Sequence, residues 1–251
     1  MIVLAGALVV ATSAPADGAT AHHSRLPTAV LGKRIIGHSV QHRPLIAYHL
    51  GDPNARRTAL ILGEMHGDEP AGVVLARSLI RGHRSTEGIN LWVIPTMNPD
   101  GYAAGTRQNA HGVDLNRNWR HNWAHLTGEY YSGPRPMSEP ETRAVARFIR
   151  AERPRFVVSL HQPLHGVDQT AGHGRAYRAF RGALSRNLSL PIKNFDCWSV
   201  CYGSLSGWFH ARGIGNAVET VEFGRHPPRT YLTSRVRRGI IAAMGGHFGS
   251  R

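Results

Sequence analysis

Histidine and glutamate occur in this sequence at positions where they could bind a metal ion and use it for hydrolysis. His66 and Glu69 stand three residues apart in the segment GEMHGDEP, His161 follows a later apolar run, and Glu222 lies within another. Two neutral imidazoles and one carboxylate leave Zn²⁺ an open coordination position, which distinguishes catalytic zinc from structural zinc. A closed structural site usually recruits thiolates, so this set of donors favours catalysis.

The H-x-x-E pair carries little information by itself. In a chain of 251 residues with 16 histidines and nine glutamates, the number of H-x-x-E pairs expected by chance is roughly one half. His161 could equally be a hydrogen-bonded core histidine, and His165 is a rival ligand close to it in the sequence. Whether these residues can form one site therefore depends on the strands and helices that carry them.

Apolar runs with the pattern of strands alternate along the chain with amphipathic stretches. We predict strands at Leu45–Leu50, Thr58–Leu62, Leu91–Pro95, Phe156–Leu160 and Ala217–Phe223. We predict helices at Glu69–Ile80, behind a capping box formed by Ser138 and Glu141, at Arg175–Leu188 and after Pro228. This alternation predicts a single α/β domain with a mostly parallel, mixed, twisted sheet and helices on both faces.

Polar groups at the carboxyl ends of strands collect into one cleft in such folds. Two further polar segments, NPDG at 98–101 and TRQNAHGVDLNRNW at 106–119, lie between the strand ending at Pro95 and the capping box. Gly101 and Gly112 punctuate turns, so we predict a long loop here. Long loops on a rigid scaffold often carry function.

Five motifs in a fixed order carry a family resemblance. HGDE, NPDG, GVDLNRNW, SLH and TVEF resemble the zinc metallocarboxypeptidases related to carboxypeptidase A. The stretches TRQNAHGVDLNRNW and YYSGPRPMSEPET are most similar to the bacterial murein peptide amidase A branch, which releases diaminopimelate from γ-D-glutamyl linkages in cell-wall peptides. The matching segments run from about residue 58 to 224, and GVDLNRNW is the most specific of them.

The resemblance implies that His66, Glu69 and His161 bind one Zn²⁺ ion and that Glu222, in TVEF, is the catalytic glutamate. Zinc polarises a carbonyl and lowers the pKa of its bound water. Glu222 can accept the water proton and return it to the leaving amine. Glu219 stands three positions earlier on the same predicted strand, so strand alternation directs it to the opposite face.

The resemblance also implies roles for residues of the polar loop. Arg107 matches the arginine that polarises the scissile carbonyl, although in so arginine-rich a chain it could instead be a solvated loop charge. Asn116 and Arg117 match the pair that holds the free carboxylate of the substrate, which a guanidinium can bind with two parallel N–H donors. We expect Asp114 to order the loop. These roles imply hydrolysis of an amide next to a free carboxylate.

Three features depart from the family pattern. Glu64 stands where relatives often have a small residue, and its carboxylate either tunes the metal site or faces solvent. Tyr202 is the one candidate for the tyrosine that caps the substrate in animal carboxypeptidases. We expect Gly203–Trp208 to contribute to the pocket for the leaving residue, but this segment has no obvious charge for the second centre of diaminopimelate.

The first residues have the pattern of a secretory signal. The run MIVLAGALVV is followed by small and polar residues and by an A-x-A site at Ala19–Ala21. Lysine and arginine, which usually precede such a run, are missing before it. We predict a signal peptide at 1–21, a linker at 22–32, a catalytic domain at 33–251 and an extracellular, periplasmic or cell-wall location.

Export would determine whether the two cysteines of the chain can form a disulfide. Cys197 and Cys201 can form a disulfide in an oxidising compartment. Two free or separately buried thiols are the alternative.

The chain is strongly basic, with 30 Lys+Arg against 16 Asp+Glu and a net charge of +14. This excess reflects either a coding bias towards arginine or attraction to anionic cell-wall polymers. We expect no nucleic-acid partner, because zinc-finger spacing, RNP-type motifs and lysine-rich runs are missing. The first apolar run is too short for a stable membrane span.

These observations predict a secreted zinc-dependent peptidase or amidase that acts on cell-wall peptides at a γ-D-glutamyl-diaminopimelate bond. A general protein metallocarboxypeptidase is the main alternative. The desuccinylase and aspartoacylase branch fits GVDLNRNW, NPDG and the export signal less well. A non-catalytic cell-wall-binding protein belongs to a different class, and intact candidates for all three ligands and the base argue against it.

Overall fold

Four parallel strands with almost fully buried side chains form the centre of the fold. The computed structural model describes residues 29–170, 172–195 and 201–250. Within them the parallel strands are β3 (Thr58–Leu62), β5 (Asn90–Ile94), β6 (Phe156–His161) and β9 (Ala217–Gly224). Continuous apolar runs suit such strands because both of their faces are covered.

Further strands extend this centre on both sides. In the described residues the large sheet has eight strands in the order β1-β2-β5-β3-β6-β9-β7-β8. β1 (Val30–His38), β2 (Pro44–Gly51) and β7 (Leu164–Asp168) join by antiparallel pairing, and β8 (Ile192–Lys193) pairs in parallel with β7. β4 (Thr86–Glu87) and β10 (His247–Phe248) form a separate pair. The predicted mixed, mostly parallel sheet is confirmed at its centre.

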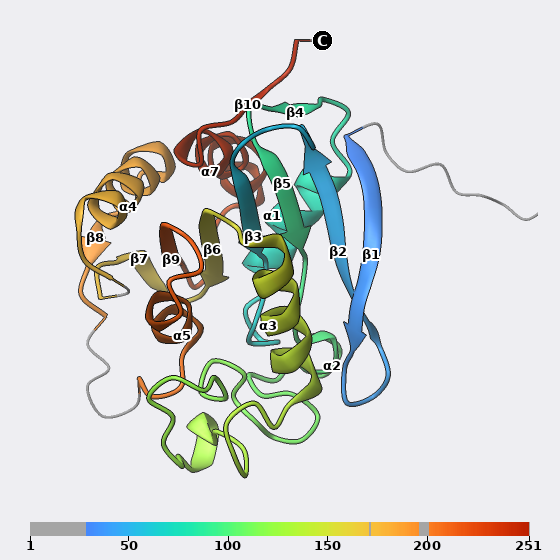
Figure 1. Ribbon diagram of the computed structural model, residues 1–251, viewed down its shortest axis with the longest axis vertical. Helices are drawn as coiled ribbons and strands as arrows, with labels where there is room; N and C mark the ends of the chain where they lie inside the picture. The colour runs from blue at the N-terminus through green and yellow to red at the C-terminus, as the bar shows by residue number, and fades with distance from the viewer. Residues whose placement is uncertain (1–28, 171, 196–200, 251) are drawn as a thin grey trace, which may run out of the picture.

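Helices cover both faces of the large sheet, as Figure 1 shows. One face carries α1 (Ala71–Ile80), α4 (Arg175–Leu188) and α7 (Arg237–Ala243), and the other carries α3 (Pro140–Glu152) and α5 (Leu205–Ala211). The short helices are α2 (Pro99–Ala104), η1 (Gly128–Tyr130), α6 (Arg229–Tyr231) and η2 (Leu232–Val236). No helix in the described ranges is both long enough and apolar enough to cross a bilayer.

Two predicted boundaries are wrong. β1 begins at Val30, so the sheet starts before the predicted end of the linker at residue 32. Most side chains of this edge strand are exposed or half-buried, which removes the alternating apolar signal. The capping box is not formed, because Glu139 is the N-cap of α3 and makes no capping bond, while the Ser138 hydroxyl donates to the Glu139 carboxylate. The predicted signal peptide and residues 22–28 of the linker lie outside the described residues.

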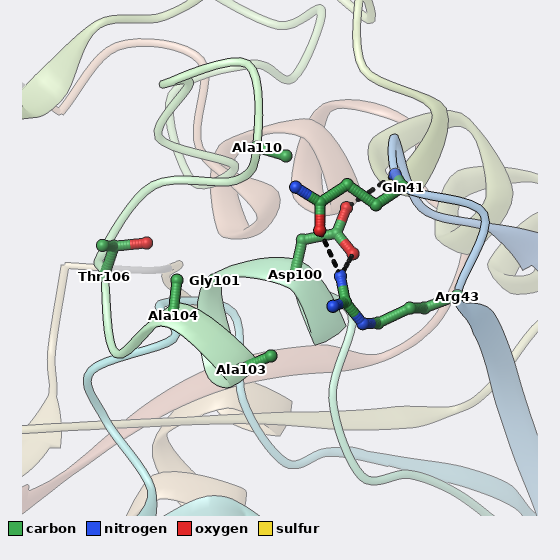
Figure 2. Close-up of a pocket in the computed structure, with 8 residues that line it drawn as sticks. All are labelled: Gln41, Arg43, Asp100, Gly101, Ala103, Ala104, Thr106 and Ala110. Carbon is green, nitrogen blue, oxygen red and sulfur yellow. Dashed lines mark hydrogen bonds and ion pairs between the residues drawn. The ribbon is translucent and has the colours of Figure 1, made fainter.

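The NPDG motif opens a helix, which corrects the prediction of one long loop. Asn98 caps α2 by accepting a hydrogen bond from the Gly101 N–H at 2.9 Å. Asp100 is buried and accepts hydrogen bonds from the Gln41 N–H and from the Arg43 guanidinium, as Figure 2 shows. NPDG therefore has a structural role, since it fastens the turn between β1 and β2 to α2.

Candidate active site

The turn that carries His66 and Glu69 is confined between β3 and α1. The Glu69 N–H donates to the His66 carbonyl oxygen at 3.0 Å and closes the turn. Gly67 packs against the backbone of Gly101 so closely that a Cβ atom there would overlap it. Only glycine fits at this position, and the tight contact with α2 fixes the direction in which the turn presents its side chains.

His161, at the end of β6, meets this turn. Its Nδ1 lies 2.9 Å from one carboxylate oxygen of Glu69, and Nδ1 of His66 lies 2.8 Å from the other. The two Nδ1 atoms are 3.3 Å apart. Donors that bind one zinc ion at about 2 Å have to lie within about 4 Å of one another, so the three side chains fit a single ion. They are the one group of potential metal ligands found among the described residues.

The second ring nitrogen of each histidine also has a partner. Nε2 of His66 lies 3.1 Å from a carboxylate oxygen of Asp114, and Nε2 of His161 lies 3.0 Å from the hydroxyl of Ser159. Contacts of this kind hold the ring orientation and tautomer that direct Nδ1 towards a metal. Asp114 also accepts hydrogen bonds from Arg107 and from the Asn116 N–H. It therefore orders the loop, as predicted, and in addition orients His66.

The electrostatics of this group favour a cation. Burial raises the pKa of Glu69, but the imidazoles of His66 and His161 outweigh burial and hold that pKa well below its usual range. Burial lowers the pKa of His66, whereas the carboxylates of Glu69 and Asp114 raise it, with a net result of about 9. A divalent cation can supply the positive charge that these buried carboxylates require, because metal binding displaces protons from its ligands.

Glu222 stands beside the metal group. It is opposite His161 in the register of β6 and β9, so both side chains are on the same face of the sheet. Burial raises the pKa of its carboxyl group, as suits a proton acceptor. Glu219 faces the other side, where it pairs with Arg181 of α4 at 3.1 Å. The two glutamates therefore serve different environments, as the predicted alternation requires.

Two arginines and a tyrosine form the adjacent wall. Arg107 donates to Asp114 at 2.8 Å and lies 3.6 Å from Glu69, so it is part of the site and not a solvated loop charge. Arg117 is buried and, like Arg107, lies over the ring of Tyr130, with centroid distances of 5.3 and 5.2 Å. Tyr130 thus holds two like-charged groups close together through cation–π contact.

All seven predicted site residues line one cleft of about 1290 Å³. They are His66, Glu69, Arg107, Asn116, Arg117, His161 and Glu222. Asn116 connects two walls of the cleft, because its side-chain oxygen accepts a hydrogen bond from the Leu205 N–H at the start of α5. A cleft of this volume has room for a short peptide.

Comparison with known proteins gives one family. The family model for zinc carboxypeptidases matches residues 24–171. Murein peptide amidase A of Vibrio campbellii is 34% identical over 192 residues, which cover 71% of this chain and 74% of that protein. The protein of the same name from Escherichia coli K12 is 36% identical over 159 residues, which cover 55% of this chain and 62% of that protein. The chain belongs to the zinc carboxypeptidase family.

The fold agrees with this assignment. The crystal structure of a murein-tripeptide amidase from Escherichia coli O157 superimposes with a TM-score of 0.70 at 28% identity, covering 87% of this chain and 94% of that one. The chain is therefore a hydrolase of the zinc carboxypeptidase family, and its cofactor is zinc.

Two open questions about the zinc carboxypeptidase site are settled by position. His165 is exposed and does not belong to the metal group, so it is not a rival of His161. Glu64 is fully buried and does not face solvent. Burial raises the pKa of Glu64 to about 8, which favours the neutral form of its carboxyl group.

The cleft contains residues that sequence reasoning missed. Tyr130 lies in the quoted stretch YYSGPRPMSEPET, which was the available signal for it. Asp168 and Arg178 also line the cleft, and no motif marks them. Ser204, Ser206 and Gly207 of the predicted pocket segment are present in the lining, as is Tyr202.

The predicted disulfide between Cys197 and Cys201 stays a prediction. Cys197 lies outside the described residues. Among the described residues there is no free cysteine.

The contact between Asp114 and His66 makes a testable prediction about zinc binding. Asp114→Asn keeps the shape of the side chain but removes the charge that orients the imidazole, so the affinity for zinc should fall roughly 10- to 100-fold. Competition with a chromophoric chelator measures this. Asp68→Asn is the matched control, because Asp68 is exposed in the same segment as the ligands. Equal affinities of the two variants would contradict the orienting role.

Proposed function

We propose that this zinc carboxypeptidase cleaves the amide bond next to diaminopimelate in cell-wall peptides. The observation that carries the reaction type is that the metal group, Glu222 and the Asn116–Arg117 pair line one cleft. The substrate class is supported by the names of two relatives, murein peptide amidase A of Vibrio campbellii and of Escherichia coli.

His66, Glu69 and His161 would hold the zinc ion. Their donor atoms face one another, and the partners of the distal ring nitrogens keep them so. When bound, zinc polarises the scissile carbonyl and makes water a better nucleophile at neutral pH. Two imidazoles and one carboxylate form a donor set typical of catalytic zinc.

Glu222 moves the proton in this proposal. Its Oε2 accepts a hydrogen bond from the Leu164 N–H at 3.2 Å, which leaves Oε1 to receive a proton from the attacking water. The water oxygen forms a bond to the carbonyl carbon, and the proton then passes from Oε1 to the nitrogen of the leaving amine as the C–N bond breaks. The raised pKa of Glu222 supports the first transfer, because a stronger base accepts the water proton more readily.

Each of the two arginines interacts with a different negative group of the reacting peptide. Arg107, next to the metal group, stabilises the charge that develops on the carbonyl oxygen. Arg117, with the amide of Asn116, binds the free carboxylate of the leaving residue through paired N–H donors. Arg117 lines the cleft, and its Nη1 donates a hydrogen bond to the Asn116 carbonyl oxygen at 2.9 Å, which holds the guanidinium in position.

We also propose that the protein is exported and stays near anionic wall polymers. The pattern of residues 1–21 and the net charge of +14 support this. N-terminal sequencing of the protein from an expressing cell should find a start after Ala21 in the fraction outside the cytoplasm. Retention of Met1 in a cytoplasmic protein would contradict export.

Two peptides separate the proposed activity from general carboxypeptidase activity. The purified protein with zinc should release diaminopimelate from L-Ala-γ-D-Glu-diaminopimelate and act poorly on ordinary peptides with a C-terminal α-linked residue. Chromatography of the products measures both. Release from ordinary peptides alone would refute the cell-wall substrate.

Substitution of the general base provides the control for this assay. Glu222→Gln should lower kcat on the cell-wall peptide roughly 100- to 10,000-fold, whereas Glu129→Gln, at an exposed site on η1, should not. Undiminished turnover by Glu222→Gln would show that another residue moves the proton.

A further inference from the structure

The cleft continues along the sheet beyond Glu222. Thr220 stands two residues before Glu222 on β9, on the same face, and also lines the cleft. β7 pairs antiparallel with β9, with Gly166 opposite Glu222 and Val167 opposite Val221. The next step of this register places Asp168 opposite Thr220, roughly 7 Å along the strand from Glu222. A substrate side chain that extends roughly 7 Å from the reaction centre in this direction therefore reaches Asp168.

Asp168 is an acidic residue that lines this part of the cleft. The residue is 8% exposed. Its carboxylate accepts hydrogen bonds from the backbone N–H and the hydroxyl of Thr170, at 2.9 and 2.7 Å. Among the described residues, Asp168 takes part in none of the ion pairs. A nearly buried carboxylate that is left unpaired at a cleft is suited to a cationic ligand.

Helix α4 contributes positive charge to the same cleft. Arg178 and Arg181 stand one turn apart on this helix, and both line the cleft. Arg181 is already committed, because it pairs with Glu219 and donates to the Gly172 carbonyl oxygen. Arg178 is exposed and has no ion-pair partner among the described residues, so its guanidinium can serve an anionic ligand.

We propose that Asp168 and Arg178 form a subsite for an amino acid group at the end of the leaving residue's side chain. Asp168 binds the ammonium and Arg178 binds the carboxylate. The inference rests on the proposed function, because diaminopimelate carries such a group on a short alkyl chain. Asp168 and Arg178 also supply the charges that the Gly203–Trp208 segment lacks.

Three peptides separate the two contacts. All are L-Ala-γ-D-Glu-X, where X is diaminopimelate, lysine or norleucine; lysine has the side-chain ammonium without the carboxylate, and norleucine has neither. Asp168→Asn keeps an acceptor for Thr170 and should lower the kcat/KM preference for lysine over norleucine roughly 10- to 100-fold. Arg178→Gln should lower the preference for diaminopimelate over lysine roughly 5-fold.

Matched variants show whether the effect belongs to the cleft. Asp52 follows β2 and accepts a hydrogen bond from the Asn54 N–H at 2.8 Å, in a turn like that of Asp168 but outside the cleft lining. Asp52→Asn should therefore leave both preferences at wild-type values. Arg175→Gln, at an exposed position in the first turn of α4 and outside the cleft lining, is the corresponding control for Arg178.

A binding measurement separates this inference from the proposed function. Calorimetry of the zinc-loaded protein with free meso-diaminopimelate should show binding that Asp168→Asn weakens and Asp52→Asn does not. If the wild type cleaves none of the peptides but binds in this pattern, the proposed function fails and the subsite stands. If the wild type cleaves the diaminopimelate peptide while Asp168→Asn preserves the lysine preference or slows all three peptides equally, the subsite is refuted and the function stands.

Discussion

The site depends on the adjacency of β3 and β6 in a parallel sheet. Parallel strands end at the same edge, so the turn after β3 and the last residue of β6 meet there although His66 and His161 are 95 positions apart. This brings a carboxylate and two imidazoles together in a buried place, where an unpaired charge is costly. A proton on His66 or a divalent cation that displaces it offsets this cost, and the buried carboxylates therefore favour binding of a divalent cation.

The loops around the metal group are fastened to one another by backbone contacts. The Arg107 carbonyl oxygen accepts hydrogen bonds from the Gly67 N–H and from the side chain of Asn98, which joins the ligand turn to α2. The Trp119 N–H donates to the Gly203 carbonyl oxygen at 2.8 Å and joins the other end of the loop to the segment before α5. Residues that have to contact one substrate are thus held by a rigid frame, as catalysis by positioning requires.

Sequence patterns predicted the centre of this protein better than its periphery. The bounds of β3 and α4 agree with the predicted ranges, because their apolar periodicity is unbroken. The edge strand β1 was missed because its side chains are largely exposed and carry no such pattern. The sequence predicts a loop at NPDG because Gly101 suggests a turn, whereas Pro99 occupies the first turn of α2.

The same contrast holds within the site. The metal group and Glu222 lie on strands or directly after one and belong to recognisable motifs, so their convergence could be predicted. Asp168 and Arg178 could not, because their relation to Glu222 depends on the register of β7 against β9 and on the packing of α4. The burial of Glu64 could not be predicted either, because glutamate is mostly exposed in proteins and no sequence signal marks this one as buried.

Elemental analysis of the purified, dialysed protein tests the central claim most directly. We predict one zinc ion per chain, and we predict that His161→Ala loses this ion while its circular dichroism spectrum remains that of a folded α/β protein. A folded wild type without stoichiometric zinc, or a His161→Ala variant that retains a full equivalent, would contradict it.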